Sequence, residues 1–197
     1  MAMSLEAKEI NILVEGKTDK DFLELYLKYL QAVSPDIQIK LKIDVSNGKD
    51  SIHNMQQIKK GKWLIIFDAD NDIQTSKIDI EKQLDDLEIS LDNIKIFLLP
   101  NNNDSGNLET LIENIVKYKE ILCCFDSYEY CLSKNMIGNK NFRTPAKKTK
   151  VFAYMSSFGY KNPTKEDQFD LSPYINFNSN YLKELKEFLI SAFKENK

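Results

Sequence analysis

The chain has 197 residues, of which 42% are hydrophobic and 29% are charged, and its formal net charge is −3. The length suits one substantial domain with a small addition, and the composition is typical of globular proteins. Proteins that bind nucleic acid by charge alone are usually more basic, so the composition argues against a non-specific nucleic-acid coat.

Two further classes are disfavoured. No apolar run approaches the roughly 18 residues of a membrane span, and the N-terminal residues, which include Glu6 and Glu9, lack the apolar core of a signal peptide. We therefore expect a cytoplasmic protein without a membrane partner. Cys123, Cys124 and Cys131 lack the paired spacing of a zinc site, which predicts buried free thiols in a helix.

The N-terminal half alternates expected strands and helices. Residues 9–14 predict a strand, and Gly16 precedes a helix whose apolar positions include Phe22 and Tyr26. Alternating apolar residues, among them Ile37 and Ile39, predict a second strand with one wetter face. Further elements follow in order: a turn at 47–48, a short helix carrying Ile52, Met55 and Ile58, a strand at 63–67, an acidic loop at 68–72, a helix carrying residues 78–87, and a strand at 94–99.

The C-terminal part is predicted to be mainly helical. Helices are expected at 107–119, 120–136, 147–158 and 179–194, with a linker at 138–145 and a loop-rich stretch at 159–177. The fourfold strand–helix alternation before them indicates an α/β fold with a mostly parallel sheet and right-handed crossovers. We predict a domain over residues 1–119 and a helical extension over 120–197 that packs on it.

Carboxylates stand where two buried strands are expected to end. Glu15 follows the first strand, and Asp68 and Asp70 follow the third. Functional crevices of open parallel sheets lie at the carboxyl ends of the strands, and a spacing of two in a strand puts Asp68 and Asp70 on the same side. Like charges this close are unfavourable without a cation, so the acids predict a site for Mg²⁺ or Mn²⁺.

The motif Glu15-Gly-x-Thr-Asp19, followed by Asp68-x-Asp70 and Gly106-x-Leu-Glu109, resembles the Toprim domain. That domain is shared by topoisomerases, bacterial primases, small ribosomal-RNA maturases and the nucleases of the overcoming-lysogenisation-defect family. The resemblance is strongest to the last of these and covers residues 9–119. It implies a Rossmann-like sheet of order 2-1-3-4.

The resemblance also implies roles for individual residues. Glu15 is expected to act as general acid/base or metal ligand, Asp68 and Asp70 as Mg²⁺ ligands, and Asp19 as a ligand of a second metal. Glu109 is expected to reach back to the cation. Asp19 and Glu109 equally suit the first turns of helices, and Asp72 suits either a further ligand or a helix cap. Lys147, Lys148 and Lys150 are candidate phosphate contacts, or else part of a solvated face.

These features predict a metal-dependent phosphodiester hydrolase, a nuclease acting on DNA or RNA. Two alternatives remain open: a non-catalytic module that binds nucleic acid or a partner protein, and a small ribosomal-RNA-processing ribonuclease. The chain has no Gly-x4-Gly-Lys-Ser/Thr motif, whereas the full nucleases of that family carry an ATPase domain. We therefore expect that any ATPase partner is encoded separately.

Overall fold

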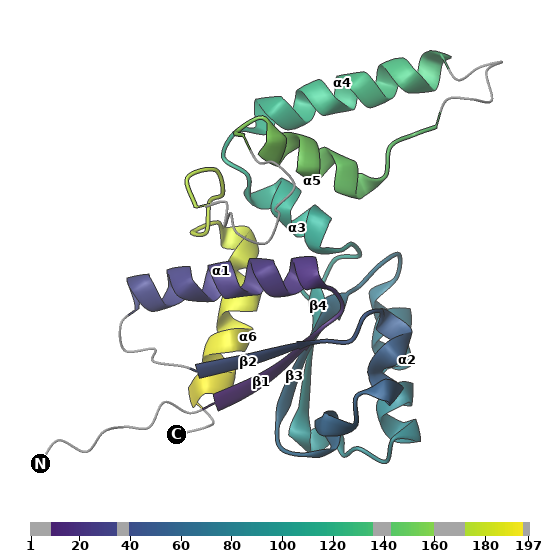
Figure 1. The fold of residues 1–197 in the computed structure, drawn as a ribbon, viewed down its shortest axis with the longest axis vertical. Helices are drawn as coiled ribbons and strands as arrows, with labels where there is room; N and C mark the ends of the chain where they lie inside the picture. Colours follow the sequence, from purple (N-terminus) through teal and green to yellow (C-terminus); the bar gives the residue numbers. More distant parts are fainter. Residues whose placement is uncertain (1–8, 35–39, 136–142, 160–171, 195–197) are drawn as a thin grey trace, which may run out of the picture. The chain divides into compact units, whose positions relative to one another are not determined.

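The structure is a computed structural model that describes residues 9–34, 40–135, 143–159 and 172–194 (Figure 1). The chain divides into two compact units, one of residues 1–108 with 180–197 and the other of residues 109–179. Compactness alone does not decide where an independently folding domain ends, so the domain boundary after residue 119 stays a prediction.

The first unit is built on one four-stranded sheet. Its strands are β1 (Glu9–Val14), β2 (Lys40–Val45), β3 (Trp63–Asp68) and β4 (Ile94–Leu99). Their order is β2-β1-β3-β4 and all neighbours are parallel, which confirms the predicted fold class and strand order. Val14, the last residue of β1, pairs with Val45 on one side and Ile66 on the other. Ile37 and Ile39, predicted in the second strand, lie outside the described residues.

Helices cover both faces of this sheet because β1 and β3 are apolar on both sides. On one face, α2 (Ile73–Asp86) contributes Ile80 and Leu84 to a core with Ile65 and Phe67 of β3. On the other face lie α1 (Lys17–Val33) and α6 (Lys183–Lys194), as Figure 1 shows. The Phe188 ring of α6 packs 5.1 Å from the Phe97 ring of β4.

The crossover from β2 to β3 differs from the expected single short helix. It consists of two 3-10 helices, η1 (Lys49–Asn54) and η2 (Gln56–Lys59), separated by Met55 in a non-helical conformation. Asp50, Ser51, His53 and Asn54 are weak helix formers, which explains why no α-helix forms there. Ile52 and Ile58 are nevertheless buried, so the predicted apolar face packs as expected. Two further 3-10 turns are η3 (Leu91–Asn93) and η4 (Asn180–Leu182).

The second unit contains helices. They are α3 (Leu108–Ile115), which starts at the last residue of the first unit, α4 (Lys119–Asn135) and α5 (Lys147–Ser156). Aromatic residues form its core: Phe158 stacks on Tyr174 with ring centroids 4.1 Å apart, and the Tyr154 hydroxyl donates a hydrogen bond to the Tyr174 carbonyl at 2.6 Å. This agrees with the predicted helical C-terminal part.

The cysteines depart from their prediction. Cys123, Cys124 and Cys131 are free thiols in a helix, as expected, but all are exposed instead of buried. The reason lies in α4, of which only Leu122 is fully buried among the described positions. Within the described part of the chain, no helix has both the length and the apolar character needed to cross a membrane.

Candidate metal centre

The strand order brings two of the predicted acids to the same edge of the sheet. After β1 the chain crosses to β2 on one side, and after β3 it crosses to β4 on the other side. The gap between β1 and β3 is therefore the point where the winding reverses and where open α/β sheets bind their ligands. Glu15 follows β1 at this point, and Asp68 is the last residue of β3.

Glu15 has the environment of an acid that needs a partner. Its Oε2 atom is buried and has no hydrogen-bond partner in the structure. Burial raises the pKa of Glu15, and the charges of Asp70 and Asp19 raise it further, whereas Lys49 and a hydrogen bond from the backbone N–H of Asp68 lower it. Asp70 and Asp19 thus both lie close enough to Glu15 to repel its carboxylate.

Asp68 and Asp70 are held by backbone contacts to the loop before α3. Asp68 Oδ1 accepts a hydrogen bond from the Leu108 N–H at 3.0 Å, and the Asp70 N–H donates to the Gly106 carbonyl at 2.8 Å. β3 ends at Asp68, and Asp70 has a φ of 53°. The expected strand alternation therefore does not extend to Asp70, whose orientation comes from this left-handed turn and its bridge to Gly106.

Asp19 belongs to the start of α1. It is 8% exposed, and its Oδ2 accepts a hydrogen bond from the Gly16 N–H at 2.8 Å. A Cβ atom at position 16 would lie 3.0 Å from that oxygen, so glycine permits the close approach. The structure shows the helix-start role of Asp19, while its role as a ligand of a second metal stays a prediction.

A cation of the chain itself already lies at this edge. Lys49, in the turn after β2, places its Nζ atom 3.0 Å from Asp70 Oδ2 and 2.9 Å from Ser76 Oγ. Its side chain is 19% exposed, against 51% for Asp70. The sequence alone does not point to this role of Lys49, because nothing in the local pattern links it to an acid 21 residues later.

The remaining candidates lie elsewhere. Asp72 caps α2, accepting from the Thr75 N–H at 2.7 Å, which shows the helix-cap role that the sequence offered for it. Glu109 is 7% exposed in the first turn of α3 and belongs to the second unit, so its role as ligand stays a prediction. Lys150 forms ion pairs with Glu113 at 3.2 Å and Asp126 at 2.6 Å, a structural role that the sequence did not indicate.

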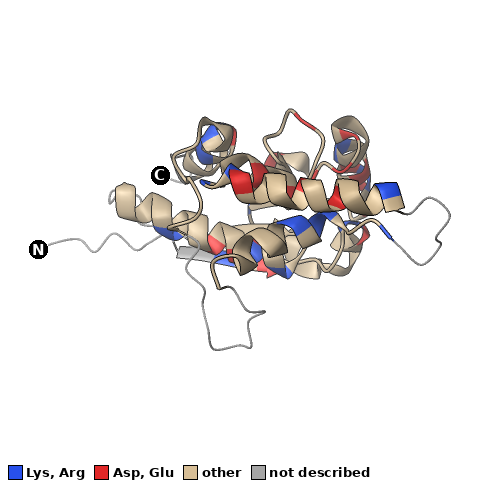
Figure 2. Ribbon diagram, turned by 90° about the horizontal axis from the view of Figure 1, so that it is seen from above, with Lys and Arg blue, Asp and Glu red and all other residues tan. Residues whose placement is uncertain are grey.

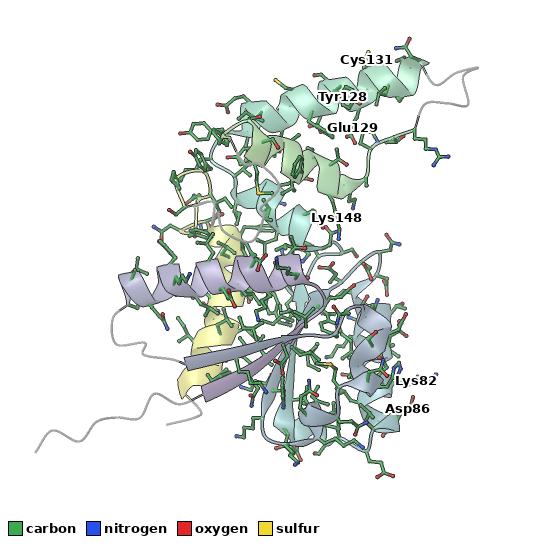
Figure 3. The ribbon with its side chains drawn as sticks, viewed as in Figure 1. Lys82, Asp86, Tyr128, Glu129, Cys131 and Lys148 are labelled. Carbon is green, nitrogen blue, oxygen red and sulfur yellow. The ribbon has the colours of Figure 1, made fainter. Side chains whose placement is uncertain are left out.

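Lys147 and Lys148 are exposed in the first turn of α5, where Figure 3 labels Lys148. Figure 2 shows basic and acidic residues interspersed along α1, α2 and α6, whereas α5 carries three lysines and no acid. Their role as phosphate contacts is a prediction.

The acids have the right ligand atoms for a hard divalent cation, but their side chains are not arranged around a common point. Carboxylate oxygens are the ligands of Mg²⁺, and the unpartnered Oε2 of Glu15 beside two further acids fits such an ion. Among the described residues, however, no three acidic, histidine or cysteine side chains converge as a ready ligand set. A cation at this site would compete with Lys49 for the carboxylate of Asp70.

Fold and site define an α/β protein with acidic residues at the reversal point of a parallel sheet. The chain belongs to the family described as "Protein of unknown function (DUF3226)", whose pattern it matches over residues 9–194. No curated protein and no solved structure matches the chain.

Proposed function

We propose that the protein is a Mg²⁺- or Mn²⁺-dependent enzyme of nucleic-acid phosphotransfer, a nuclease that hydrolyses phosphodiester bonds. The observation that supports it best is the buried, unpartnered Oε2 atom of Glu15 beside Asp70 and Asp19. A partly buried carboxylate beside like charges is unfavourable, so its presence at the end of β1 is explained more readily by a ligand than by stability.

In this proposal each residue has a distinct task. When bound, the metal would supply an activated water and positive charge beside the phosphate. Glu15, Asp68 and Asp70 would hold it, with Asp19 and Glu109 as further ligands. The Leu108 N–H orients Asp68 through Oδ1. Burial and the neighbouring acids raise the pKa of Glu15, which makes its carboxylate a stronger proton acceptor than an ordinary glutamate.

The Toprim resemblance belongs to the same proposal. The resemblance is the basis for proposing a nucleic-acid substrate and a separately encoded ATPase partner, and the lack of an apolar span or signal peptide is the basis for proposing a cytoplasmic protein. Exposed Lys147 and Lys148 would contact the phosphate backbone as point charges. Lys150 would take part only by giving up its ion pairs with Glu113 and Asp126.

A pair of isosteric variants tests the proposal. Asp68→Asn and Asp72→Asn each remove one negative charge from the same loop, and asparagine preserves an oxygen for the Leu108 N–H and for the cap of α2. We expect Asp68→Asn to lower the cleavage rate at least about a hundredfold, because a ligand of the metal is lost. Asp72→Asn should leave the rate within about twofold of wild type.

The assay uses single- and double-stranded DNA and RNA, each with Mg²⁺, Mn²⁺ and EDTA. Cleavage of structured ribosomal RNA alone would favour the ribosomal-RNA-processing alternative. Cleavage that survives EDTA, or an Asp68→Asn variant as active as Asp72→Asn, would show that this site is not the source of the activity.

One observation favours a non-catalytic binding module. Lys49 neutralises Asp70 without a metal, through an ion pair of 3.0 Å. A module of this kind would bind nucleic acid or a partner protein but would not bind Mg²⁺ or Mn²⁺ at millimolar concentration. Titration calorimetry with both ions distinguishes the two functions.

A further inference from the structure

Lys49 is held in place from two directions by α2. Its Nζ atom donates to Ser76 Oγ at 2.9 Å and to Asp70 Oδ2 at 3.0 Å. The Gln83 side chain donates to the Lys49 carbonyl at 3.1 Å. Residues of α2 therefore hold both the backbone carbonyl of Lys49 and the end of its side chain.

Ser76 fixes the lysine independently of Asp70. Its side chain is buried, and its hydroxyl donates to the Ala69 carbonyl at 2.8 Å. A serine hydroxyl has one proton, so toward Lys49 this oxygen acts only as an acceptor. Lys49 would keep this anchor if Asp70 turned away.

The lysine and a divalent cation would compete for the same oxygen. An ammonium group and a metal ion cannot both lie against Asp70 Oδ2 without repulsion. The Lys49 Nζ atom has three N–H donors, and its two acceptors within the described residues are Ser76 and Asp70. If a metal ion bound the Asp70 carboxylate, Ser76 would occupy one N–H of Lys49, and the other two could donate to another ligand.

We propose that Lys49 is an internal counter-ion that pairs with Asp70 in the metal-free protein and contacts a phosphate oxygen of the nucleic acid once a divalent cation has taken Asp70. The inference rests on the proposed function, because it uses the same cation site. It adds a substrate-binding residue and explains why the acids do not converge in the metal-free arrangement. Lys49 thus balances the charge of Asp70 until a metal ion binds.

The first test measures Mn²⁺ affinity without nucleic acid. Lys49→Met removes the competing cation, so we expect Mn²⁺ to bind roughly two- to tenfold more tightly than to wild type. Lys82→Met is the matched control, because Lys82 is exposed on α2 and Figure 3 shows it at the outer side of that helix. It changes the net charge equally and should leave the affinity within about twofold. Mere structural damage would weaken Mn²⁺ binding, so the sign is diagnostic.

The second test measures nucleic-acid affinity at saturating Mg²⁺. The probes are a phosphorothioate-linked DNA oligonucleotide and its RNA counterpart, whose binding is followed by fluorescence anisotropy. Lys49→Met should weaken binding roughly tenfold, and Ser76→Ala should weaken it in the same direction, because the anchor of Lys49 is lost. Lys49→Arg should keep the Mn²⁺ affinity of wild type within about twofold, because the charge is retained.

The outcomes separate this inference from the proposed function. If wild type binds Mn²⁺ and Lys49→Met binds it no more tightly, the counter-ion role is overturned while the cation site stands. If Ser76→Ala leaves oligonucleotide binding unchanged, the phosphate contact is overturned, and this test holds even if Lys49→Met does not fold. If no variant binds Mn²⁺ at millimolar concentration, both proposals are overturned.

Discussion

At the scale of single residues, Glu15 carries the most informative environment in the molecule. An acid that is partly buried, lies near Asp70 and Asp19, and has an oxygen without a partner lowers the stability of the metal-free fold. Lys49 and the backbone of Asp68 relieve part of this strain. The remaining cost is what a bound cation would relieve in the function that we propose.

The cost of this arrangement can be measured. Glu15→Gln removes the buried charge, so in EDTA at pH 7 we expect its thermal unfolding midpoint to lie about 1–4 °C above that of wild type. Glu81→Gln, which removes a charge from a more exposed pair with Lys77 on α2, should shift the midpoint by less than about 1 °C. A lower midpoint for Glu15→Gln would mean that its carboxylate stabilises the metal-free fold.

The same shift predicts a pH dependence with a definite sign. Because folding raises the pKa of Glu15 above 4.5, its ionised form destabilises the folded state, and this cost is fully present above the raised pKa. The cost shrinks as the pH falls through the raised pKa and disappears below the unfolded value of 4.5, where both states are protonated. The difference in unfolding free energy between wild type and Glu15→Gln should therefore shrink from pH 7 to pH 4.5. Urea denaturation in EDTA at several pH values measures it.

At the scale of elements, the start of α1 shows how one residue can serve two purposes. Asp19 accepts from the Gly16 N–H, one of the first groups of a helix that lack a partner within the helix. This contact explains the acid without any metal. The same contact keeps the Asp19 carboxylate close to Glu15, where it could serve as a ligand of a second cation.

Two substitutions separate these purposes. Asp19→Ala should lower the free energy of unfolding in EDTA by about 1 kcal/mol, because the contact to Gly16 is lost. Asp19→Asn keeps an acceptor oxygen and should lose less than about 0.5 kcal/mol. If Asp19 is also a ligand, Asp19→Asn will weaken Mn²⁺ binding despite its intact stability, and unchanged Mn²⁺ affinity would limit Asp19 to the helix start.

At the scale of the whole molecule, the second unit depends on a lysine that the sequence suggested for a different task. Lys150 of α5 bridges Glu113 of α3 and Asp126 of α4, with its side chain 16% exposed. Burial by itself lowers the pKa of Lys150, but the ion pairs with Asp126 and Glu113 outweigh burial and raise it. The Lys150 ammonium group thus links α5 to α3 and α4.

Neighbouring lysines of α5 allow a matched comparison. Lys150→Met should lower the free energy of unfolding by about 1 kcal/mol, since two acids lose their partner. Lys148→Met removes an exposed charge and should change it by less than about 0.5 kcal/mol, while weakening nucleic-acid binding if the proposed phosphate contact exists. Equal effects of the two variants on stability would mean that the ion pairs of Lys150 contribute nothing measurable.

Much of the fold follows from local sequence. Apolar runs at 12–14 and 64–67 predict buried strands, and their alternation with amphipathic helices predicts a parallel sheet with its carboxyl ends at one edge. Glu15 and Asp68 follow from that reasoning alone. The crossover at residues 49–59 was expected as one helix because its apolar spacing is helical, and the polar residues between prevented it.

The site in its final form depends on contacts between residues that are distant in sequence. Lys49 meets Asp70 and Ser76, and Asp68 meets the Leu108 N–H, only because the sheet brings separate turns together. No periodicity records such a pairing, since it arises from packing and not from local propensity. The sequence by itself determined which acids stand at the edge of the sheet. Only the tertiary structure decided which of them are already partnered and that an oxygen of Glu15 is not.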